Sequence, residues 1–364
     1  MTIAKYRDRN PSKNALNSKP QFHKLIYLIQ HYLIYTIYLL IPVSFYSCSY
    51  LMEASVPGET EPKGTRLLFS SHGGSGATRE DTLDIFAFND DKLMRLDSYT
   101  RTMGYKTDEV SIATQAGNKI VFICTGPDKR RSDWASIDCY QTLREIRVSL
   151  EDEKSDALCM TAECHIKAGK DPGNRIELQP VASQVVLNSI RCDFTDKGYA
   201  ECNITDVKVY LLNVNAQSTL INDGIWNPER ILNHGHLDED DLTSLAQPSL
   251  LLQELDEDIS KNVMRPDIRL LCYPNNSSYE SPGSPFTRLV IEGKIEGTTY
   301  YWPININRPP YGDGGIERNC RYEYDVVIRK KGNADPDTTV ETDDISMNMK
   351  VTKWKEIEEY PVRF

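Results

Sequence analysis

The chain has 364 residues, of which 40% are hydrophobic, so it is long enough to form two domains with sizeable cores. Its formal net charge is −11 at pH 7, from 42 Lys and Arg residues against 53 Asp and Glu residues. An acidic surface repels phosphate backbones, so this balance argues against nucleic acid as a partner and favours solubility outside the cell.

The first 48 residues have the pattern of an export signal. A basic segment that ends at Lys24 precedes an apolar run from Leu25 to Ser47, and Cys48 follows directly. A basic region, an apolar region and a small residue before a cysteine indicate a secretory signal with a lipobox, so we expect 1–48 to be a signal peptide with lipidation at Cys48. The alternative is an uncleaved transmembrane anchor, because a run of this length can span a bilayer.

A tether and a short strand follow the signal. Residues 49–64 contain Pro, Gly and Glu with little apolar surface to bury, which predicts a flexible tether. Thr65–Ser71 is the first candidate strand, and a Gly-rich loop then leads to Arg79. The loop lacks the Gly-Lys-Ser/Thr ending of a phosphate-binding loop. An exposed loop that ends in a single Arg is instead a good site for a trypsin-like protease.

The middle of the chain reads as a series of short strands. Leu83–Phe88 and Ile120–Cys124 are apolar on both faces, as interior strands of a sandwich are. Tyr140–Leu150 fits either a short helix or a strand. A new set of strands begins near Asn203, so we expect an N-terminal domain at 65–203 and a C-terminal domain at 204–364.

The C-terminal part predicts two pairs of strands. The pattern predicts a hairpin about Glu296-Gly297, formed by Arg288–Ile295 and Thr298–Ile306. Further on, apolar residues alternate in two runs that are joined by a turn rich in Gly, Asn, Asp and Pro. The first run contains Cys320, Tyr322, Tyr324, Val326 and Ile328. The second contains Ile345, Met347, Met349 and Val351, and Trp354 lies out of phase with it. Both runs predict strands with one buried face.

This last stretch resembles a known family. Ile316-Glu317-Arg318-Asn319 leading into Tyr322, then the turn, then an alternating strand that ends in Trp354, resembles the C-terminus of the fimbrillins that build type V pili. These are protease-assembled, donor-strand pili of anaerobic Gram-negative bacteria. Cys159–Glu163 resembles another segment of the family. The resemblance covers Thr65–Trp354 and implies an all-β fold with two transthyretin-like antiparallel β-sandwich domains in tandem.

The resemblance also implies a function. The chain would be a structural subunit of a type V pilus that is exported as a lipoprotein, held at the outer membrane through Cys48, cut after Arg79 by an Arg-specific protease, and polymerised into an extracellular fimbrium by donor-strand exchange. Its partners would be other pilus subunits, that protease, and a host or bacterial surface ligand. The displaced strand would contain Leu67, Leu68 and Phe69. The donor strands would lie within 344–364 and use Ile345, Met347, Met349, Val351 and Trp354.

Two other functions stay open at this point. A fimbrial tip adhesin or glycan-binding surface lipoprotein could use Trp226 or Trp302 as a stacking platform, although core packing is the simpler role for each Trp. A basal anchor subunit would keep its lipid and first strand, and the candidate cleavage loop argues against it.

We find no catalytic, cofactor or metal constellation to propose, and expect the chain not to be an enzyme. His234 and His236 beside the acidic run Asp238–Asp241 are the strongest candidate for a metal site, but a solvated acidic loop is the simpler interpretation. Eight cysteines follow Cys48 in an exported chain, and Cys192 with Cys202 could form a disulfide across a turn. We expect most of the others to be free thiols.

Overall fold

The fold is described from a computed structural model. By its internal contacts the chain divides into two units, 1–60 and 61–364, and only the second contains residues with a described structure. The structure describes residues 63–70, 82–103, 109–126, 134–170, 176–222, 228–340 and 344–354. The predicted signal peptide, Cys48, Arg79 and Trp226 therefore lie outside the described residues. Within these ranges, no helix is both long and apolar enough to cross a membrane.

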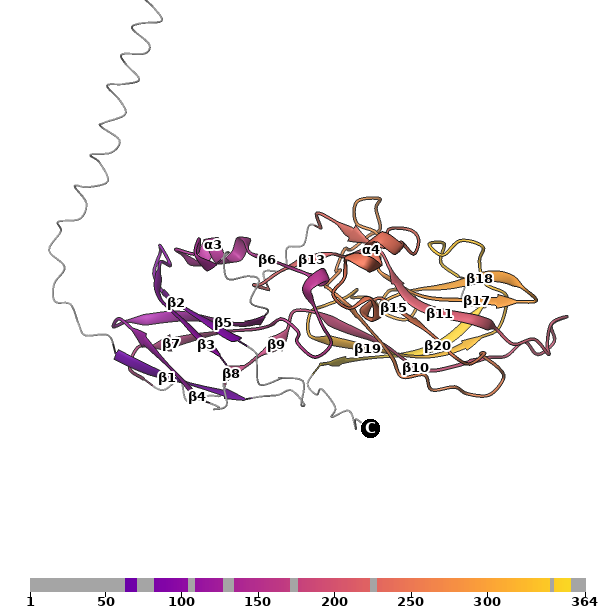
Figure 1. The fold of residues 1–364 in the computed structure, drawn as a ribbon, viewed down its shortest axis with the longest axis horizontal. Helices are drawn as coiled ribbons and strands as arrows, with labels where there is room; N and C mark the ends of the chain where they lie inside the picture. The colour runs from indigo at the N-terminus through magenta and orange to yellow at the C-terminus, as the bar shows by residue number, and fades with distance from the viewer. Residues whose placement is uncertain are drawn as a thin grey trace, which may run out of the picture. The chain divides into compact units, whose positions relative to one another are not determined.

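Two sheets in the first half of the second unit enclose an apolar core (Figure 1). The larger sheet has the strand order β3 (Leu96–Met103), β2 (Thr82–Asn89), β5 (Asn118–Gly126), β7 (Met160–Lys167), β9 (Gln179–Pro180). The smaller sheet has the order β4 (Glu109–Thr114), β1 (Lys63–Ser70), β8 (Ile176–Glu177). The core between them, called the N-terminal core here, consists of Leu67, Leu83, Ile85, Ala87, Val110, Ile112, Val121, Ile123, Ile166, Ile176 and Leu178.

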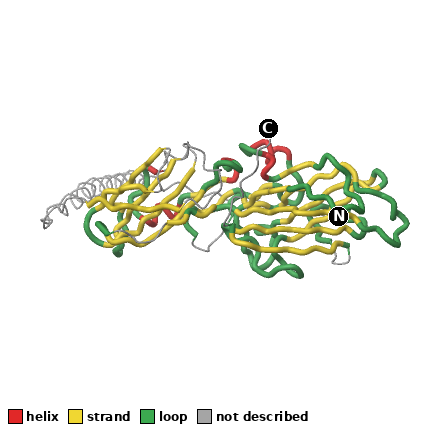
Figure 2. Tube along the Cα trace, turned by 90° about the horizontal axis from the view of Figure 1, so that it is seen from below, coloured by secondary structure: helices red, strands yellow, loops and turns green. Residues whose placement is uncertain are grey.

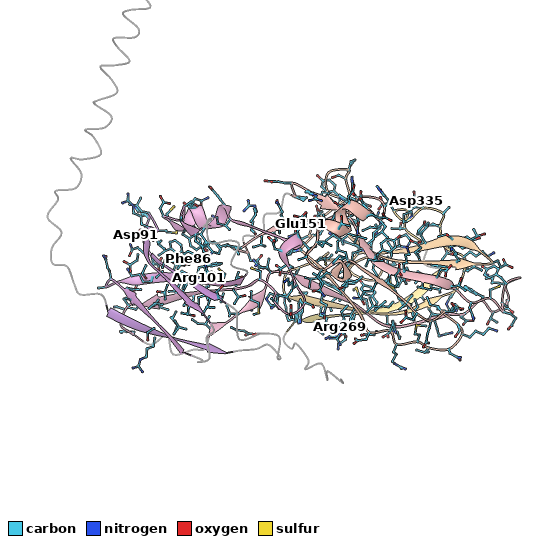
Figure 3. The ribbon with its side chains drawn as sticks, viewed as in Figure 1. Phe86, Asp91, Arg101, Glu151, Arg269 and Asp335 are labelled. Atoms are coloured by element: carbon cyan, nitrogen blue, oxygen red, sulfur yellow. The ribbon has the colours of Figure 1, made fainter. Side chains whose placement is uncertain are left out.

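The central strands of the larger sheet are buried on both faces, as their sequence predicts. Leu83 to Phe88 in β2 and Ile120 to Cys124 in β5 are all buried. One face of the sheet contributes to the N-terminal core. On the other face, Phe86 packs edge-on against Trp134 with ring centroids 5.3 Å apart, and side chains fill the space around it (Figure 3).

Two further four-stranded sheets form the second half. One has the order β16 (Ile268–Cys272), β10 (Ser183–Cys192), β19 (Cys320–Ile328), β20 (Ile345–Lys353). The other has the order β15 (Leu252–Glu254), β11 (Thr205–Leu212), β17 (Arg288–Ile295), β18 (Thr298–Asn305). All five alternating residues predicted to face inwards from β19 are buried, which confirms that strand. The all-β prediction is confirmed, and Figure 2 shows strands throughout this unit.

Shorter elements connect the sheets. β6 (Arg147–Ser149) pairs with β13 (Gln217–Thr219), and β12 (Val214–Asn215) pairs with β14 (Ile231–Leu232). The ambiguous segment at 140–150 forms a helix and then a strand, since α3 spans Tyr140–Glu145 and β6 follows it. The other elements within the described residues are α4 (Glu239–Ser244) and the 3₁₀ turns η2 (Leu150–Asp152) and η3 (Pro248–Leu250).

The predicted hairpin of β17 and β18 is present. The two strands pair from Arg288–Asn305 to Ile295–Thr298 without a break. Glu296 and Gly297 both have a positive φ, 52° and 78°, as a two-residue turn that follows the right-handed twist of the strands requires.

Strand β10 joins strands that come much later in the chain. It pairs in parallel with β19 and antiparallel with β16, so Ser183–Cys192 lies in a sheet of the second half. Its residues Val185, Leu187 and Ile190 contact the same core as β19. The domain bounds at 203 and 204 remain a prediction, and the pairing of β10 leads us to propose a boundary just before Ser183.

Candidate functional site

β1 is the middle strand of the smaller N-terminal sheet. It pairs antiparallel with β4 from Lys63–Thr114 to Leu68–Glu109, and its last two residues, Phe69 and Ser70, pair in parallel with β8. Every residue of the strand therefore has a partner, and the displacement of β1 would break both ladders at once.

The three residues predicted for the displaced strand all belong to β1. Leu67 has no exposed surface and lies in the N-terminal core. The backbones of Leu68 and Phe69 pair with Glu109 of β4 and Ile176 of β8. β1 thus covers one side of a core whose other side is formed by β2 and β5, and removing it would leave an apolar groove.

β20 lies at the edge of its sheet. In the described part of the chain it pairs with β19 alone, antiparallel from Cys320–Lys353 to Ile328–Ile345. An edge strand is bound to the sheet by one ladder, so it can leave without separating two other strands.

The inward face of β20 is buried at one end and exposed at the other. Ile345 is 2% exposed and Val351 is 43% exposed, while Met347 and Met349 between them are half-buried. Trp354 follows the strand, packs partly against the same core, and donates its backbone N–H to the Asn319 carbonyl at 2.9 Å. The structure therefore places the five predicted donor residues in one segment, and the Val351 side chain is exposed although its backbone pairs with β19.

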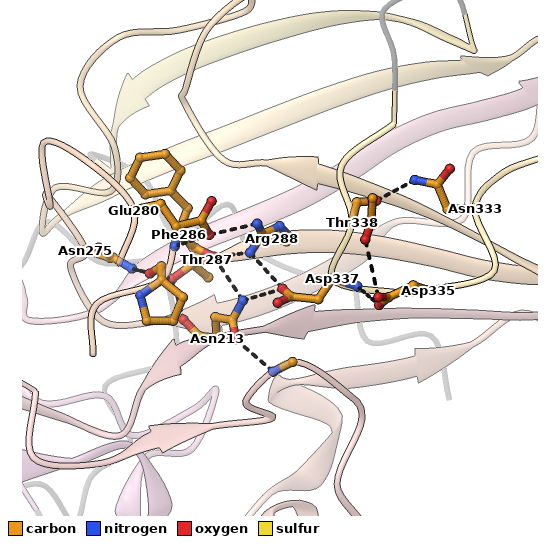
Figure 4. A network of polar contacts seen from close by, with 12 residues as sticks. Asn213, Asn275, Glu280, Phe286, Thr287, Arg288, Asn333, Asp335, Asp337 and Thr338 are labelled. Carbon is orange, nitrogen blue, oxygen red and sulfur yellow. Dashed lines mark hydrogen bonds and ion pairs between the residues drawn. The ribbon is translucent and has the colours of Figure 1, made fainter. Parts of the chain in front are cut away.

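An ion-pair network centred on the buried Arg288 anchors the turn before β20 (Figure 4). The Arg288 side chain, 5% exposed, contacts Glu280 Oε1 at 2.7 Å and Asp337 Oδ1 at 2.8 Å. Asn213 Nδ2 donates to the same Asp337 oxygen at 2.8 Å. Alternation in the sequence does not single out Arg288, so sequence reasoning missed this network. It fixes the turn between β19 and β20 to β17.

Arg318, one of the residues that carry the family resemblance, connects β7 with the segment after β13. Its guanidinium donates to the Leu220 carbonyl at 3.0 and 3.1 Å and to Thr161 Oγ1 at 3.3 Å. A single side chain thus joins three segments that are distant in sequence.

Next to Arg318 lies a cavity of about 730 Å³ with a mixed polar lining. Tyr140 Oη donates to Glu163 there. Burial raises the pKa of the Cys164 thiol to about 11, and the charge of Glu163 adds to this shift. The other polar groups of the lining are Arg144, Thr161, His165, Glu177, Gln179 and Asn222.

The acidic run near His236 has a structural role. Asp238 caps the N-terminus of α4, where its side chain accepts the backbone N–H groups of Asp240 and Asp241. His236 Nε2 lies 3.9 Å from Asp238, and among the described residues no group of His, Cys, Asp and Glu could hold a metal ion.

Two other predicted residues also have structural roles. Trp302 is fully buried and its indole N–H donates to the Lys330 carbonyl at 3.0 Å, so the idea of Trp302 as an exposed stacking platform is wrong. The proposed disulfide between Cys192 and Cys202 is absent, because both thiols are free and Cys192 Sγ lies 3.5 Å from the Ile259 carbonyl. The other six described cysteines are free as well.

The fold is similar to that of solved adhesion and fimbrial proteins. No family model and no curated protein matches the sequence. A candidate cell adhesion protein from Bacteroides eggerthii matches with a TM-score of 0.61 and 15% identity over 82% of this chain and 97% of that chain. One from Parabacteroides distasonis matches with a TM-score of 0.58 and 13% identity over 82% and 99%. A fimbrillin from Porphyromonas gingivalis matches with a TM-score of 0.57 and 12% identity over 81% and 98%. The chain therefore has a fimbrillin-like fold.

Proposed function

We propose that this protein is a structural subunit of a type V pilus that polymerises by donor-strand exchange. The observation that carries the proposal is the position of β1, which fills the middle of a sheet and one side of a core, and which precedes the Gly-rich sequence that contains Arg79. The fimbrillin-like fold supports it. Cleavage after Arg79 would free β1 from the rest of the chain, and a strand of a neighbouring subunit would replace it.

The second half of the chain supplies the donor in this proposal. β20 is an edge strand with alternating apolar residues, so it can add to a sheet of another subunit in the way that β1 adds to β4. A donor needs apolar side chains at every second position to fill successive pockets of the groove. Ile345, Met347, Met349 and Val351 satisfy this requirement.

The proposal includes export and anchoring. The precursor would be a lipoprotein, attached through Cys48 to the outer membrane, and cleavage after Arg79 would release the subunit into an extracellular fimbrium. An Arg-specific protease and other pilus subunits are its proposed partners, and contact with a host or bacterial surface would make the fibre adhesive.

N-terminal sequencing of the assembled form at the cell surface tests the proposal. We expect the assembled chain to begin at Glu80, directly after Arg79. An assembled chain that still begins at Cys48 and carries its lipid would contradict release of β1 and would favour a basal anchor.

A glycan-binding tip adhesin is the second candidate, and the cavity beside Arg318 favours it. Carboxylate, amide, phenol and guanidinium groups line this cavity together with Ile221 and Phe122, and sugars are bound by such mixtures of polar and apolar contacts. A glycan array with purified protein tests it. Glycan binding that is lost on Asn222→Ala would support the adhesin. If no glycan on the array is bound, the structural subunit of the pilus shaft is the better account.

A further inference from the structure

Three polar side chains, two of them buried, form a cluster at one end of the β2–β5 ladder. The Lys119 side chain is 1% exposed, and its Nζ donates to Asn89 Oδ1 at 2.6 Å. The same Nζ lies 3.0 Å from Asp97 Oδ2, and the Asp97 side chain is 2% exposed. The Lys119 amine therefore contacts both a carboxamide and a carboxyl group; the amine and the carboxyl group are shielded from water, and Asn89 is half-buried.

The sheet itself brings these residues together. Asn89 and Lys119 are direct partners in the β2–β5 ladder. They follow the same alternation as Ala87 and Val121, so they continue the row of side chains that forms the N-terminal core.

Asp97 reaches the cluster through an irregularity in β3. Ala87 pairs with Ser98 but Phe88 pairs with Leu96, so Asp97 is the additional residue of a β-bulge. A bulge changes the direction of a side chain, and here it directs the carboxylate to Lys119. The backbone N–H of Gln115 donates to the same carboxylate oxygen at 2.9 Å and holds it in place.

Burying an ion pair lowers the stability of a fold unless other contacts compensate, because both groups lose their hydration. A buried Lys–Asp pair therefore suggests a role beyond stability. The three groups supply the components of an amide exchange: a nucleophile, a carbonyl group in contact with it, and an acid–base group that also contacts the nucleophile. Burial of Lys119 and Asp97 limits the access of water to the amine and the acid–base group.

We propose that Lys119 and Asn89 form an intramolecular isopeptide bond, with Asp97 as the acid–base group. Lys119 gives a proton to Asp97, and the neutral Nζ attacks Cγ of Asn89. A proton passes from the attacking nitrogen to Nδ2 through the Asp97 carboxyl group, the Cγ–Nδ2 bond breaks, and ammonia leaves. The new bond is an amide between Nζ and Cγ. Only the atoms of ammonia are lost, and neither an oxidant nor a reductant is needed.

The bond would join β2 to β5, the two strands that form the side of the N-terminal core opposite β1. It would hold that part of the sandwich together during any loss of β1. The reaction does not require strand exchange, so a failure of this proposal and a failure of the proposed function are distinguishable.

Peptide mapping of the full chain, expressed with its export signal, tests the proposal. Trypsin cannot cut after an amide-linked Lys119, so the wild-type digest should contain one branched product made of residues 80–92 and 107–129. We expect its mass to be below the sum of the two peptides by one ammonia, about 17 Da. Unlinked peptides of full mass, with cleavage after Lys119, would overturn the proposal whatever the variants show.

Three variants identify the role of each group. Asn89→Ala and Lys119→Met should lose the branched product. Asp97→Asn keeps the size of the side chain but removes the acid, so it should leave Lys119 and Asn89 unlinked. Circular dichroism of each variant establishes that it has folded. A branched product of the same yield in folded Asp97→Asn would overturn the role of Asp97.

Discussion

Leu67 in β1 lies directly opposite Val110 in β4, and both side chains belong to the N-terminal core. Partners in an antiparallel ladder point to the same face of the sheet, so this pair closes one side of the core. If β1 leaves, β4 loses its ladder with β1 and Val110 loses the neighbour that shields it. Under the proposed function, the stability of the uncleaved chain and its readiness for strand exchange would therefore depend on the same contacts.

The first prediction concerns the contribution of Leu67. Leu67→Ala should lower the free energy of unfolding of the uncleaved protein by about 2–5 kcal/mol, because it removes a fully buried side chain. The control is Arg66→Ala on the exposed face of the same strand, which should change stability by less than about 1 kcal/mol. Urea unfolding measures both. Equal losses in the two variants would argue against a core role for Leu67.

The second prediction concerns cleavage. Arg79→Ala should prevent release of β1 by an Arg-specific protease and should stop assembly, while the fold is unchanged. The control is Arg66→Ala, which should leave cleavage and assembly unchanged. Arg66 lies within the paired part of β1, where a protease has no access to the backbone. Mass spectrometry of a limited digest identifies the first cut. A first cut after Arg66, or inside either half of the fold, would reassign the site.

The strands with clear patterns could be predicted from the sequence. Strict alternation in 320–328 predicts β19, because one face of this strand is buried and the other is not. Apolar runs predict β2 and β5 as central strands for the opposite reason, since both of their faces are buried. The Glu296-Gly297 turn is predictable because few residue pairs adopt two positive φ angles in succession.

Contacts between distant segments could not be predicted in this way. The pairing of β10 with β19 joins residues more than a hundred positions apart, and no local pattern specifies it. Arg288 and Arg318 look like surface cations in the sequence, yet their partners are carboxylates and carbonyls from other segments. The exposure of Val351 could not be predicted either. Alternation indicates which face of a strand points inwards, but not how far other elements cover that face.

The third prediction uses the Cys164 thiol, whose pKa burial raises to about 11. The thiolate is the reactive form, so at pH 9 Cys164 should react with iodoacetamide roughly fiftyfold more slowly than a thiol of ordinary pKa. Its rate should rise about tenfold per pH unit up to pH 10. Peptide mapping of alkylation over time measures this. Glu163→Gln removes the smaller cause of the shift and should raise the rate modestly. A rate already constant above pH 9 would contradict the burial of Cys164.

The fourth prediction concerns the network that anchors the turn before β20. Arg288→Met should cost about 1–3 kcal/mol of stability, because the partly exposed carboxylates of Glu280 and Asp337 would lose the charged hydrogen bonds of their shared buried partner. Lys294→Met on the same strand is the matched control, since its ion pair with Asp206 is exposed and should contribute less than about 1 kcal/mol. Thermal or urea unfolding compares them. A similar loss in both variants would show that burial of the Arg288 network adds nothing.

The last prediction concerns the donor strand. Met347→Asp introduces a charge on the face of β20 that would enter the groove of a neighbouring subunit, where an unpaired charge costs several kcal/mol even after relaxation. Asn348→Asp adds the same charge to an exposed position on the opposite face, so it is the matched control. Met349→Asp should behave like Met347→Asp. Truncation after Lys350 should also leave a protein that is cleaved and folded but cannot lengthen a fibre.

Electron microscopy of mixtures with cleaved wild type measures these effects. Met347→Asp and the truncated chain should shorten the fibres or reduce their number, because each would bind a growing end without supplying a strand to the next subunit. Asn348→Asp should leave fibre length unchanged. If Met347→Asp and Asn348→Asp give fibres of the same length and number as the wild type, the inward face of β20 is not the donor. In that case the glycan-binding adhesin becomes the better account of the protein.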